Sequence, residues 1–336
     1  MTVALPPAFT DPPLTPDQLA AIVRRAFGPE ATLAEAVPVG GGTVNEAWWL
    51  GLGDRHGPDA ILRVAPSVQA AASGPSWLTS DGLRREGAAI ALLPPLAPIL
   101  PRTIRFDGSR EIVSRDWIVQ TIVPGRPWSE VDPGLDDAAR IALWRQLGAV
   151  CRAIHAVRGP AFGPAHDPRF PTWADLLRDD ARGLLVDADA GRFGLDREPF
   201  ARLLAAVEAN RGVLNRVTTP ALIHSDLGPR HCFVAPDMDG AWRIIGLIDL
   251  EFARFADPMS ESTIVGFDLT PPDPRFRDAF SAGYGPVDAP PGRERRAALY
   301  AAIALGWIAT DLARLGSPED VAGVLTQMTG RLDALG

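Results

Sequence analysis

The 336-residue chain contains no lysine, so all 33 of its basic residues are arginine. Without lysine the protein cannot form a Schiff base with a carbonyl substrate, and it has no P-loop lysine for binding phosphates. Phosphate or carboxylate groups must therefore be bound by arginine, by backbone N–H groups or through a metal ion. Ala, Gly, Pro and Arg are all abundant, so codon bias is the simplest explanation of the composition, but the chemical consequence is the same.

Cysteine and long apolar runs are scarce as well. The two cysteines, Cys151 and Cys232, are too few for a disulfide framework or a cysteine metal cluster, which favours a reducing cytoplasm. The apolar stretches over 87–101 and 297–309 are shorter than the roughly 20 residues that span a bilayer. The Pro-rich first residues do not resemble a signal peptide. We therefore expect a cytoplasmic protein that has no membrane partner.

Positive charge is in deficit. The chain has 41 acidic residues and 33 arginines, so its formal net charge is −8 and its isoelectric point is near 5.2. This balance argues against nucleic acid or an anionic membrane surface as the main partner, and it mildly favours a cationic small molecule. A hydrophobic content of 46% allows the chain to bury a sizeable core.

The first third of the chain has the pattern of a small sheet with helices. A loose Pro-rich arm is expected over 1–14, and Thr15 to Gln18 form a capping box that opens a helix to Phe27. A further helix is expected from a cap at Thr79 or Ser80 to the stop at Pro94. Alternation and apolar runs predict strands at 37–39, 44–52, 60–64, 103–106 and 117–123.

The character of the sequence changes at Pro124. Helical spacing dominates from there, with one β-like interruption over 221–253. The predicted helices include one through 143–154 and others near 173–185, 197–216, 274–284, 293–315 and 318–334. The sequence thus predicts an α+β fold with an N-terminal lobe over 1–123, containing a small mixed sheet, and a larger, mainly helical lobe over 124–336. A hinge near 120–125 joins them.

The most informative segment is ALIHSDLGPRHCFV (221–234), followed by IIGLIDLEFARFADP (244–258). A strand leads into a polar loop, a turn reverses the chain, and the returning strand brings Asp249 back beside the loop. Hairpin geometry therefore places His224, Asp226, His231 and Asp249 close together. Two carboxylates and an imidazole at one point need a cation or a proton-transfer task to hold them there. A metal that bridges phosphate oxygens meets that demand, whereas each residue alone is more often a turn or strand cap.

The runs H-S-D-L-G-P-R-H, I-D-L-E and A-D-P resemble the catalytic signature of the aminoglycoside phosphotransferase family. These kinase-like enzymes phosphorylate antibiotics and other small molecules, and the resemblance, which covers most of the chain, implies a bilobal, protein-kinase-like fold. In the catalytic loop 224–231 it implies that Asp226 aligns the acceptor hydroxyl and accepts its proton. At the strand end 249–251 it implies that Asp249 is the main Mg²⁺ ligand. His231 occupies the position of the second metal ligand, where the family usually has asparagine.

The resemblance also implies a site for ATP or GTP in the N-terminal lobe. Gly40 to Asn45 resembles the nucleotide loop of the family, so that Gly41, Gly42, Thr43 and Asn45 are the expected contacts. Arg63 lies where the family often has a phosphate-binding lysine, and Glu86 on the following helix is its expected partner. Segment 119–125 resembles the hinge, where backbone groups of Thr121 and Val123 are expected to hold the base.

The acceptor pocket is expected among the C-terminal helices, and its candidate residues are Glu251, Asp268, Trp307 and Asp311. We expect an aminoglycoside acceptor and a resistance-type O-phosphotransferase. A macrolide phosphotransferase, which the histidine variant fits, and a metabolic alcohol or sugar kinase are alternatives. A nucleotide-binding pseudokinase or interaction module would fit the departures at Arg63 and His231, but the intact aspartates argue against it. A hydrolase using Ser225 with His224 lacks the G-x-S-x-G elbow.

Overall fold

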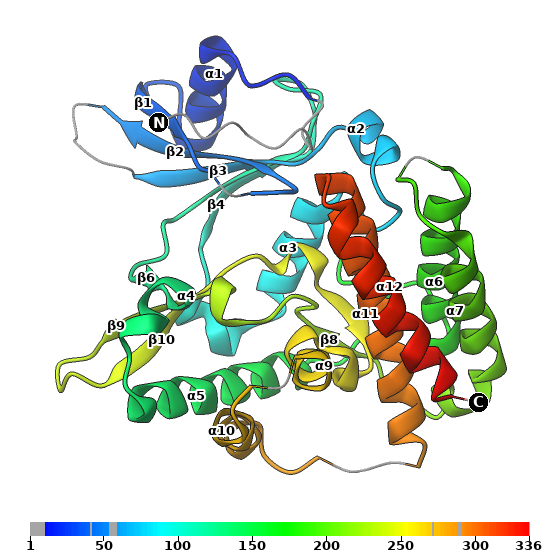
Figure 1. Ribbon diagram of the computed structural model, residues 1–336. Coiled ribbons are helices and arrows are strands. Elements are labelled where there is room, and N and C mark those ends of the chain that lie inside the picture. Colours follow the sequence, from blue (N-terminus) through cyan, green and yellow to red (C-terminus); the bar gives the residue numbers. More distant parts are fainter. Residues whose placement is uncertain are drawn as a thin grey trace.

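A five-stranded sheet forms the N-terminal lobe of the computed structural model, which describes residues 11–40, 42–53, 59–191, 193–270, 272–287 and 291–335. The strand order is β1-β2-β3-β5-β4 (Figure 1). All pairings in this sheet are antiparallel, so the expected mixed sheet is wrong in that detail. The strands are β1 (Leu33–Pro38), β2 (Glu46–Leu52), β3 (Ala60–Val64), β4 (Thr103–Asp107) and β5 (Trp117–Gln120).

Helix α1 (Pro16–Phe27) has the predicted capping box between Thr15 and Gln18. The helix forms one apolar cluster with the sheet, which includes its buried residues Leu19, Ile22 and Val23. The expected loose arm is corrected over residues 11–14. There the Asp11 carboxylate accepts a 2.8 Å hydrogen bond from the Ser67 backbone, and Leu14 is buried. Residues 1–10 of that arm lie outside the described residues.

Two helices connect β3 to β4, namely α2 (Val68–Ser73) and α3 (Gly82–Ala91). The N-cap position of α3 is held by Asp81 and not by Thr79 or Ser80 as predicted, and its side chain makes no capping hydrogen bond. Helix α3 ends three residues before Pro94. It lies between the sheet and the C-terminal lobe, so its side chains can reach the space between the lobes (Figure 1).

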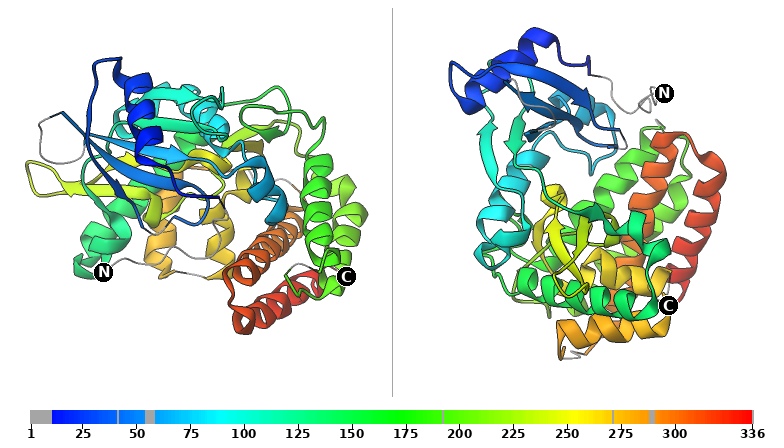
Figure 2. Two further views of the ribbon diagram at one scale, coloured as in Figure 1. Left: turned by 90° about the horizontal axis from the view of Figure 1, so that it is seen from above. Right: turned by 90° about the vertical axis from the view of Figure 1, so that its left-hand side faces the viewer.

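The C-terminal lobe is mainly helical, as predicted. Figure 2 shows helices α11 and α12 beside α6 and α7. The predicted helix over 197–216 divides at Asn210, and α9 was not predicted. The helices are α4 (Trp128–Val131), α5 (Asp137–His155), α6 (Trp173–Asp189), α7 (Arg197–Ala209), α8 (Arg211–Leu214), α9 (Ser262–Leu269), α10 (Pro274–Tyr284), α11 (Arg293–Leu315) and α12 (Pro318–Asp333).

Two small sheets interrupt these helices and present the segment 221–256. One sheet has the order β10-β9-β6, and the other has the order β7-β11-β8. The loop that follows β8 and the turn that follows β10 therefore lie together at the surface that faces the N-terminal lobe (Figure 1). The strands are β6 (Arg126–Pro127), β7 (Gly163–Pro164), β8 (Ala221–Ile223), β9 (Cys232–Pro236), β10 (Trp242–Leu247) and β11 (Arg254–Ala256).

Helix α11 is long and apolar enough to cross a membrane by length and composition alone. Half of its most apolar window is buried inside the protein, where the helix packs against α6, α7, α9 and α12. The central helix of a water-soluble lobe passes the same test, so this feature is weak evidence for a membrane span.

Helices α5 and α10 cross at unusually close range because glycine occupies the contact on both sides. A Cβ added at Gly148 of α5 would overlap the carbonyl oxygen of Phe280, and one added at Gly283 of α10 would overlap that of Arg145. Backbone atoms cannot move aside as a flexible side chain can. The crossing therefore requires both glycines.

We expect Gly148→Ala to lower the free energy of unfolding by about 1–3 kcal/mol, because the methyl group must push the two helices apart. Gly323→Ala is the matched control, because Gly323 is exposed on α12 with nothing within 4 Å of the added Cβ. Alanine there should raise the free energy of unfolding by up to about 1 kcal/mol, since it favours the helix more than glycine does. Urea unfolding followed by circular dichroism measures both changes. A Gly148→Ala protein as stable as wild type would contradict the close crossing.

Candidate active site

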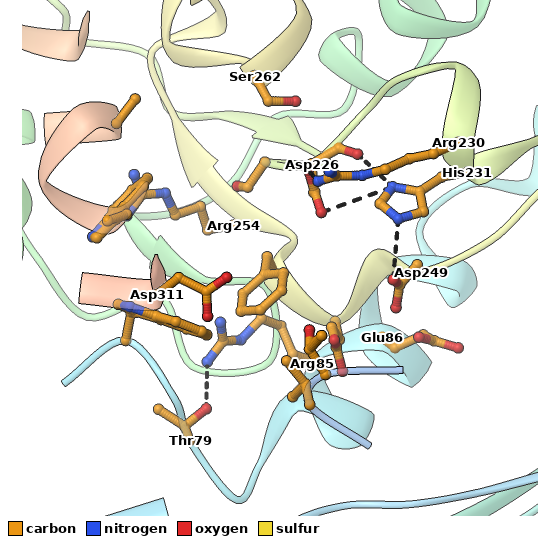
Figure 3. A pocket seen from close by; sticks show the side chains of 18 of the residues that line it. Thr79, Arg85, Glu86, Asp226, Arg230, His231, Asp249, Arg254, Ser262 and Asp311 are labelled. Atoms are coloured by element: carbon orange, nitrogen blue, oxygen red, sulfur yellow. Dashed lines mark hydrogen bonds and ion pairs between the residues drawn. The ribbon is translucent and has the colours of Figure 1, made fainter. Parts of the chain in front are cut away.

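A cleft with a volume of about 1220 Å³ lies between the lobes. It is lined from β2, β3 and α3 on one side and from the catalytic loop, α6, α9, α11 and α12 on the other. Asp226, His231 and Asp249 all face it (Figure 3). The cleft thus contains the cluster that the sequence predicts.

His224 holds the catalytic loop against the end of β10. Its ring is fully buried, with Nε2 3.0 Å from the carbonyl oxygen of Ile248, while the Asp226 N–H donates to its Nδ1 at 3.3 Å. These two bonds assign the proton to Nε2. Neither ring nitrogen is hydrogen-bonded to Ser225, and within the described part of the chain the Ser225 hydroxyl has no partner, so the hydrolase alternative loses its support. Ser225 has a φ of 71°, and this left-handed turn directs the chain into Asp226.

His231 links the two aspartates. Its Nδ1 lies 2.6 Å from the carbonyl oxygen of Asp226, and its Nε2 lies 3.3 Å from the Asp249 carboxylate. The carbonyl contact assigns the proton to Nδ1, so the Nε2 lone pair faces Asp249. The predicted proximity of His224, Asp226, His231 and Asp249 is confirmed.

The carboxylate of Asp226 forms an ion pair with Arg230 (Figure 3). Burial raises the pKa of Asp226 to about 6, although the charge of Arg230 opposes the rise. A carboxylate with this pKa is largely ionised at neutral pH and still basic enough to accept a proton from a hydroxyl.

Arg63 is the centre of an ion-pair network between the lobes. Its guanidinium pairs with Glu86 of α3, with Asp249 at 2.7 Å and with Glu251 at 3.3 Å. The predicted Arg63–Glu86 pairing is therefore confirmed. Although burial opposes the charged form, the three carboxylates raise the pKa of Arg63 above its ordinary value. The second Glu86 oxygen accepts a 2.8 Å hydrogen bond from Gln120 of β5.

Asp249 has a left-handed backbone with a φ of 73° at the turn after β10. Asp is one of the residues that tolerate this conformation. Burial alone would raise the pKa of its carboxyl, but the charge of Arg63 lowers it, so Asp249 stays ionised. The Asp249 carboxylate and the Nε2 of His231 are a donor set that can hold a divalent cation. Oxygen suits Mg²⁺, and imidazole also accepts Mn²⁺.

Glu251 belongs to the Arg63 network and also lines the cleft, so its predicted role toward the acceptor stays a prediction. It is almost fully buried and accepts hydrogen bonds from Arg63 and from the amide of Asn45. Burial and the adjacent charge of Asp249 raise the pKa of Glu251, whereas the charge of Arg63 lowers it. Asn45, expected to touch nucleotide, is buried but lines the cleft, and its amide nitrogen donates to Glu251 while its amide oxygen has no partner among the described residues.

The remaining predicted nucleotide contacts line the cleft, except that Gly41 lies outside the described residues. Gly42 and Thr43 line it from the glycine loop, and the Thr43 carbonyl accepts a 3.1 Å hydrogen bond from Arg314 of α11. Thr121 and Val123 line it at the hinge. Among the described residues nothing bonds to the carbonyl of Thr121 or to the N–H of Val123, so both can meet a base.

Trp307 and Asp311 of α11 line the cleft, whereas Asp268 does not. Asp268 has a 40% exposed side chain that faces Arg277 at 3.6 Å, so the prediction that it lines the acceptor pocket is wrong. We define the acceptor side of the cleft as the part that lies across Asp226 from His231 and Asp249 (Figure 3). It is lined by Trp77, Thr79, Arg85, Asp180, Phe252, Arg254, Trp307 and Asp311.

Sequence reasoning missed several of these residues. Arg85 stands next to the predicted Glu86, and Arg254 lies five residues after Asp249, so the motifs themselves were the available signal. Trp77 precedes α3 in a segment without any motif. Its ring packs 5.9 Å from that of Phe252, and its indole N–H donates to Thr310 of α11.

Glu261 was also missed, although it anchors the catalytic loop. Its fully buried carboxylate accepts hydrogen bonds from the backbone N–H of His224 at 2.8 Å and of Ser262 at 2.9 Å, and it lies 3.5 Å from His155 of α5. Burial alone would raise its pKa, but the contact with His155 and these bonds lower it to about 2. One carboxylate therefore joins α5, α9 and the loop.

The comparisons with known proteins agree with this geometry. A model of the phosphotransferase enzyme family matches residues 35–299. The GDP and kanamycin complex of APH(2")-IIia is 20% identical, covers 94% of this chain and 98% of that chain, and has a TM-score of 0.62. The GDP complex of wild-type aminoglycoside 2'-phosphotransferase-IIIa is 18% identical, with coverages of 96% and 99% and a TM-score of 0.63.

A thermostable mutant of APH(4)-Ia, solved with AMP-PNP and hygromycin B, is 19% identical, with coverages of 95% and 97% and a TM-score of 0.61. At these identities the structural likeness shows the fold alone. No curated protein matches the sequence significantly.

The chain belongs to the phosphotransferase enzyme family, because the family model covers most of its length. The predicted kinase-like fold is confirmed. The prediction of a phosphotransferase that has an alcohol group as acceptor is also confirmed at the level of this enzyme class.

The lowered pKa of Glu261 predicts acid sensitivity with a definite sign. The ionised carboxylate stabilises the folded state above its ordinary pKa of 4.5, and this contribution is lost as the pH falls from 4.5 toward about 2. We expect Glu261→Gln to lower the free energy of unfolding at neutral pH by up to about 3 kcal/mol. The deficit should shrink below pH 4.5.

Urea unfolding of both proteins across this pH range measures the difference. Glu319→Gln, at an exposed position of α12, is the control and should change little at any pH. A deficit of constant size down to acid pH would show that the charge of Glu261 does not stabilise the fold.

Proposed function

We propose that this phosphotransferase moves the γ-phosphoryl group of a nucleoside triphosphate to a hydroxyl of a small molecule. The observation that carries the proposal is the convergence of Asp226, His231 and Asp249 beside the Arg63–Glu86 pair in one interlobe cleft. In the proposed reaction a bond forms between the acceptor oxygen and the γ-phosphorus, and the bond to the β-phosphate bridging oxygen breaks. The hydroxyl proton passes to Asp226, and the nucleoside diphosphate leaves.

The nucleotide would lie against the N-terminal lobe. The base would meet the Thr121 carbonyl and the Val123 N–H, and the phosphates would lie beneath the glycine loop at Gly42 and Thr43. Arg63 would bind phosphate oxygens with the guanidinium nitrogens that now face Asp249 and Glu251, while Glu86 holds it in place. A planar guanidinium can contact a carboxylate and a phosphate together, so arginine can replace lysine here.

Asp249 and His231 would hold a divalent cation, Mg²⁺ in the first place. The donor set fits because Nδ1 of His231 is bonded to the Asp226 carbonyl, which leaves Nε2 free beside the Asp249 carboxylate. When bound, the cation would neutralise charge on the phosphate oxygens. His231 and its bond to Asp226 would also keep the metal ligands and the catalytic loop in register.

Asp226 would act on the acceptor. Its carboxylate faces the cleft and is held in place by Arg230, and its raised pKa suits a group that aligns a hydroxyl and accepts its proton. A pseudokinase would not require this arrangement, because nucleotide binding alone does not use a carboxylate aimed at the acceptor side.

The aminoglycoside acceptor predicted from the sequence is supported by similar structures solved with kanamycin and hygromycin B. The lining favours an acceptor that is less polar than an aminoglycoside, such as a macrolide, because Trp77, Phe252 and Trp307 give the acceptor side large apolar surfaces. Incubation with Mg²⁺, ATP or GTP, and a panel of aminoglycosides, macrolides, sugars and metabolic alcohols decides between them. A mass gain of one phosphate identifies the acceptor, and failure to bind either nucleotide would overturn the proposed function.

Replacement of the catalytic carboxylate is the direct test of the mechanism. We expect Asp226→Asn to lower turnover by about 10²–10⁴-fold while the Kd for nucleotide changes by less than about twofold. Asp237→Asn, in the β9–β10 turn, is the matched control and should keep full turnover. An equal loss of nucleotide affinity, or undiminished turnover, would remove Asp226 from this role.

Arg63 can be tested by nucleotide binding alone. We expect Arg63→Ala to weaken ATP or GTP binding by about tenfold or more, because a charge-assisted contact to phosphate is lost. Arg63→Lys keeps the charge that compensates Glu86, Asp249 and Glu251, so it should recover folding stability and part of the affinity. Isothermal titration calorimetry measures both variants. An unchanged Kd in the folded Arg63→Ala protein would exclude a phosphate contact.

A further inference from the structure

Two arginines that the proposed mechanism does not use line the acceptor side. Arg85 comes from α3 and Arg254 from the first position of β11, and both lie on the same side of Asp226 in the cleft (Figure 3). Their side chains are only 10% and 11% exposed. Buried guanidinium groups of this kind normally have their hydrogen bonds satisfied.

The hydrogen-bond donors of each guanidinium are only partly used by the protein, although that of Arg254 also lies 5.0 Å from the ring of Trp307 and 5.9 Å from that of Trp173. Nη2 of Arg85 donates to Thr79 at 3.1 Å and to Asp81 at 3.3 Å, and Nη1 of Arg254 donates to Asp180 at 2.8 Å. Among the described residues the other terminal nitrogen of each has no partner, and the buried Nε of each is also unpaired. Both side chains thus keep unused donors at the cleft.

The neighbouring carboxylates compensate these charges incompletely. Asp81 is shared with His166, whose Nε2 lies 3.0 Å from its second oxygen. Burial raises the pKa of Asp180, the partner of Arg254. Burial and the nearby charge of Arg254 lower the pKa of Arg85, so the two guanidinium groups repel each other. An oxyanion on the acceptor side would relieve the repulsion and fill the unused donors.

The acidic groups of the same region are less available. Asp311 is paired with Arg314 at 2.7 Å, and that arginine also donates to Thr43 of the glycine loop. Asp179 lines the cleft at an exposed position. A polycationic acceptor would therefore meet two buried positive charges on the acceptor side as well as the carboxylates of Asp179 and Asp311.

We propose that Arg85 and Arg254 form an oxyanion subsite, so that the acceptor carries a carboxylate or phosphate group in addition to the hydroxyl that is phosphorylated. The inference rests on the proposed function, because it assigns this side of the cleft to the acceptor. It selects hydroxylated acids or phosphate esters over polycationic antibiotics. The anionic group would be held by the two guanidinium groups while the hydroxyl lies against Asp226.

The first test measures binding of acetate and of inorganic phosphate to the protein loaded with Mg²⁺ and AMP-PNP, in which the nucleotide covers Arg63. We expect saturable binding of at least one ion, weakened by about tenfold or more in Arg85→Gln and Arg254→Gln. Arg84→Gln is the matched control, because Arg84 lies next to Arg85 but pairs with Asp116 away from the cleft. The two ions distinguish a carboxylate subsite from a phosphate subsite.

The absence of lysine allows a second measurement of ion binding, which does not require the protein to tolerate glutamine at position 85 or 254. Arg254→Lys carries the only lysine of the chain, so modification by an amine-reactive reagent can be followed at that one residue by peptide mass mapping. We expect the bound ion to slow modification of this lysine. Equal rates with and without acetate and phosphate would overturn the subsite, as would ion binding that survives both glutamine substitutions.

Turnover with glucose, gluconate, glucose 6-phosphate and kanamycin then compares neutral, anionic and cationic polyols. Phosphorylation of gluconate or glucose 6-phosphate with a KM that rises in Arg85→Gln supports the subsite. Phosphorylation of kanamycin with rejection of both anions would overturn it and leave the proposed function intact. Failure of the wild-type protein to bind ATP or GTP would instead refute the proposed function.

Discussion

The site depends on the guanidinium of Arg63 and the three carboxylates around it. Glu86 belongs to the N-terminal lobe, whereas Asp249 and Glu251 belong to the C-terminal lobe. Three buried carboxylates would repel one another, and leaving any of them unpaired in a dry site would cost several kcal/mol. The single arginine offsets this repulsion and thereby holds the lobes in register. Because the chain has no lysine, only the planar, multi-donor cation is available for this position, and its geometry allows several partners at once.

The catalytic loop is held from behind by groups that need not touch a substrate. His224 bonds the end of β10, and Glu261 joins the loop backbone to α5 and α9. Asp226 and His231 are therefore positioned on a rigid support while their functional atoms stay at the cleft surface. Left-handed backbone at Ser225 and Asp249 marks the two points where the chain turns sharply to achieve this. Such conformations persist where surrounding hydrogen bonds compensate their cost.

The acceptor side is more heterogeneous than the charge of the whole chain suggests. A net charge of −8 favours cations at long range, yet the buried groups on the acceptor side include two incompletely paired guanidinium groups and several aromatic rings. Net charge describes the exposed surface, where most charges are solvated and screened. Recognition in a cleft depends on the few groups removed from water. The net charge of the chain and the buried groups of the cleft can therefore favour acceptors of opposite charge.

The sequence by itself determined the lobes, the capping box at Thr15 and the strand-loop-strand hairpin, because these follow from local periodicity and from short, rigid connections. The pairing of Arg63 with Glu86 was implied by the family resemblance. Tertiary structure alone decided which side chains share the cleft. It buried Glu251 against Asn45, left Asp268 facing solvent and placed Arg85 of α3 and Arg254 of β11 on the same side of Asp226. Helix packing and lobe orientation set these contacts over long sequence separations, and no local spacing rule encodes them. The missing lysine leaves arginine as the long cationic side chain that can bind anions, and the structure places Arg63, Arg85 and Arg254 among the arginines that line one cleft.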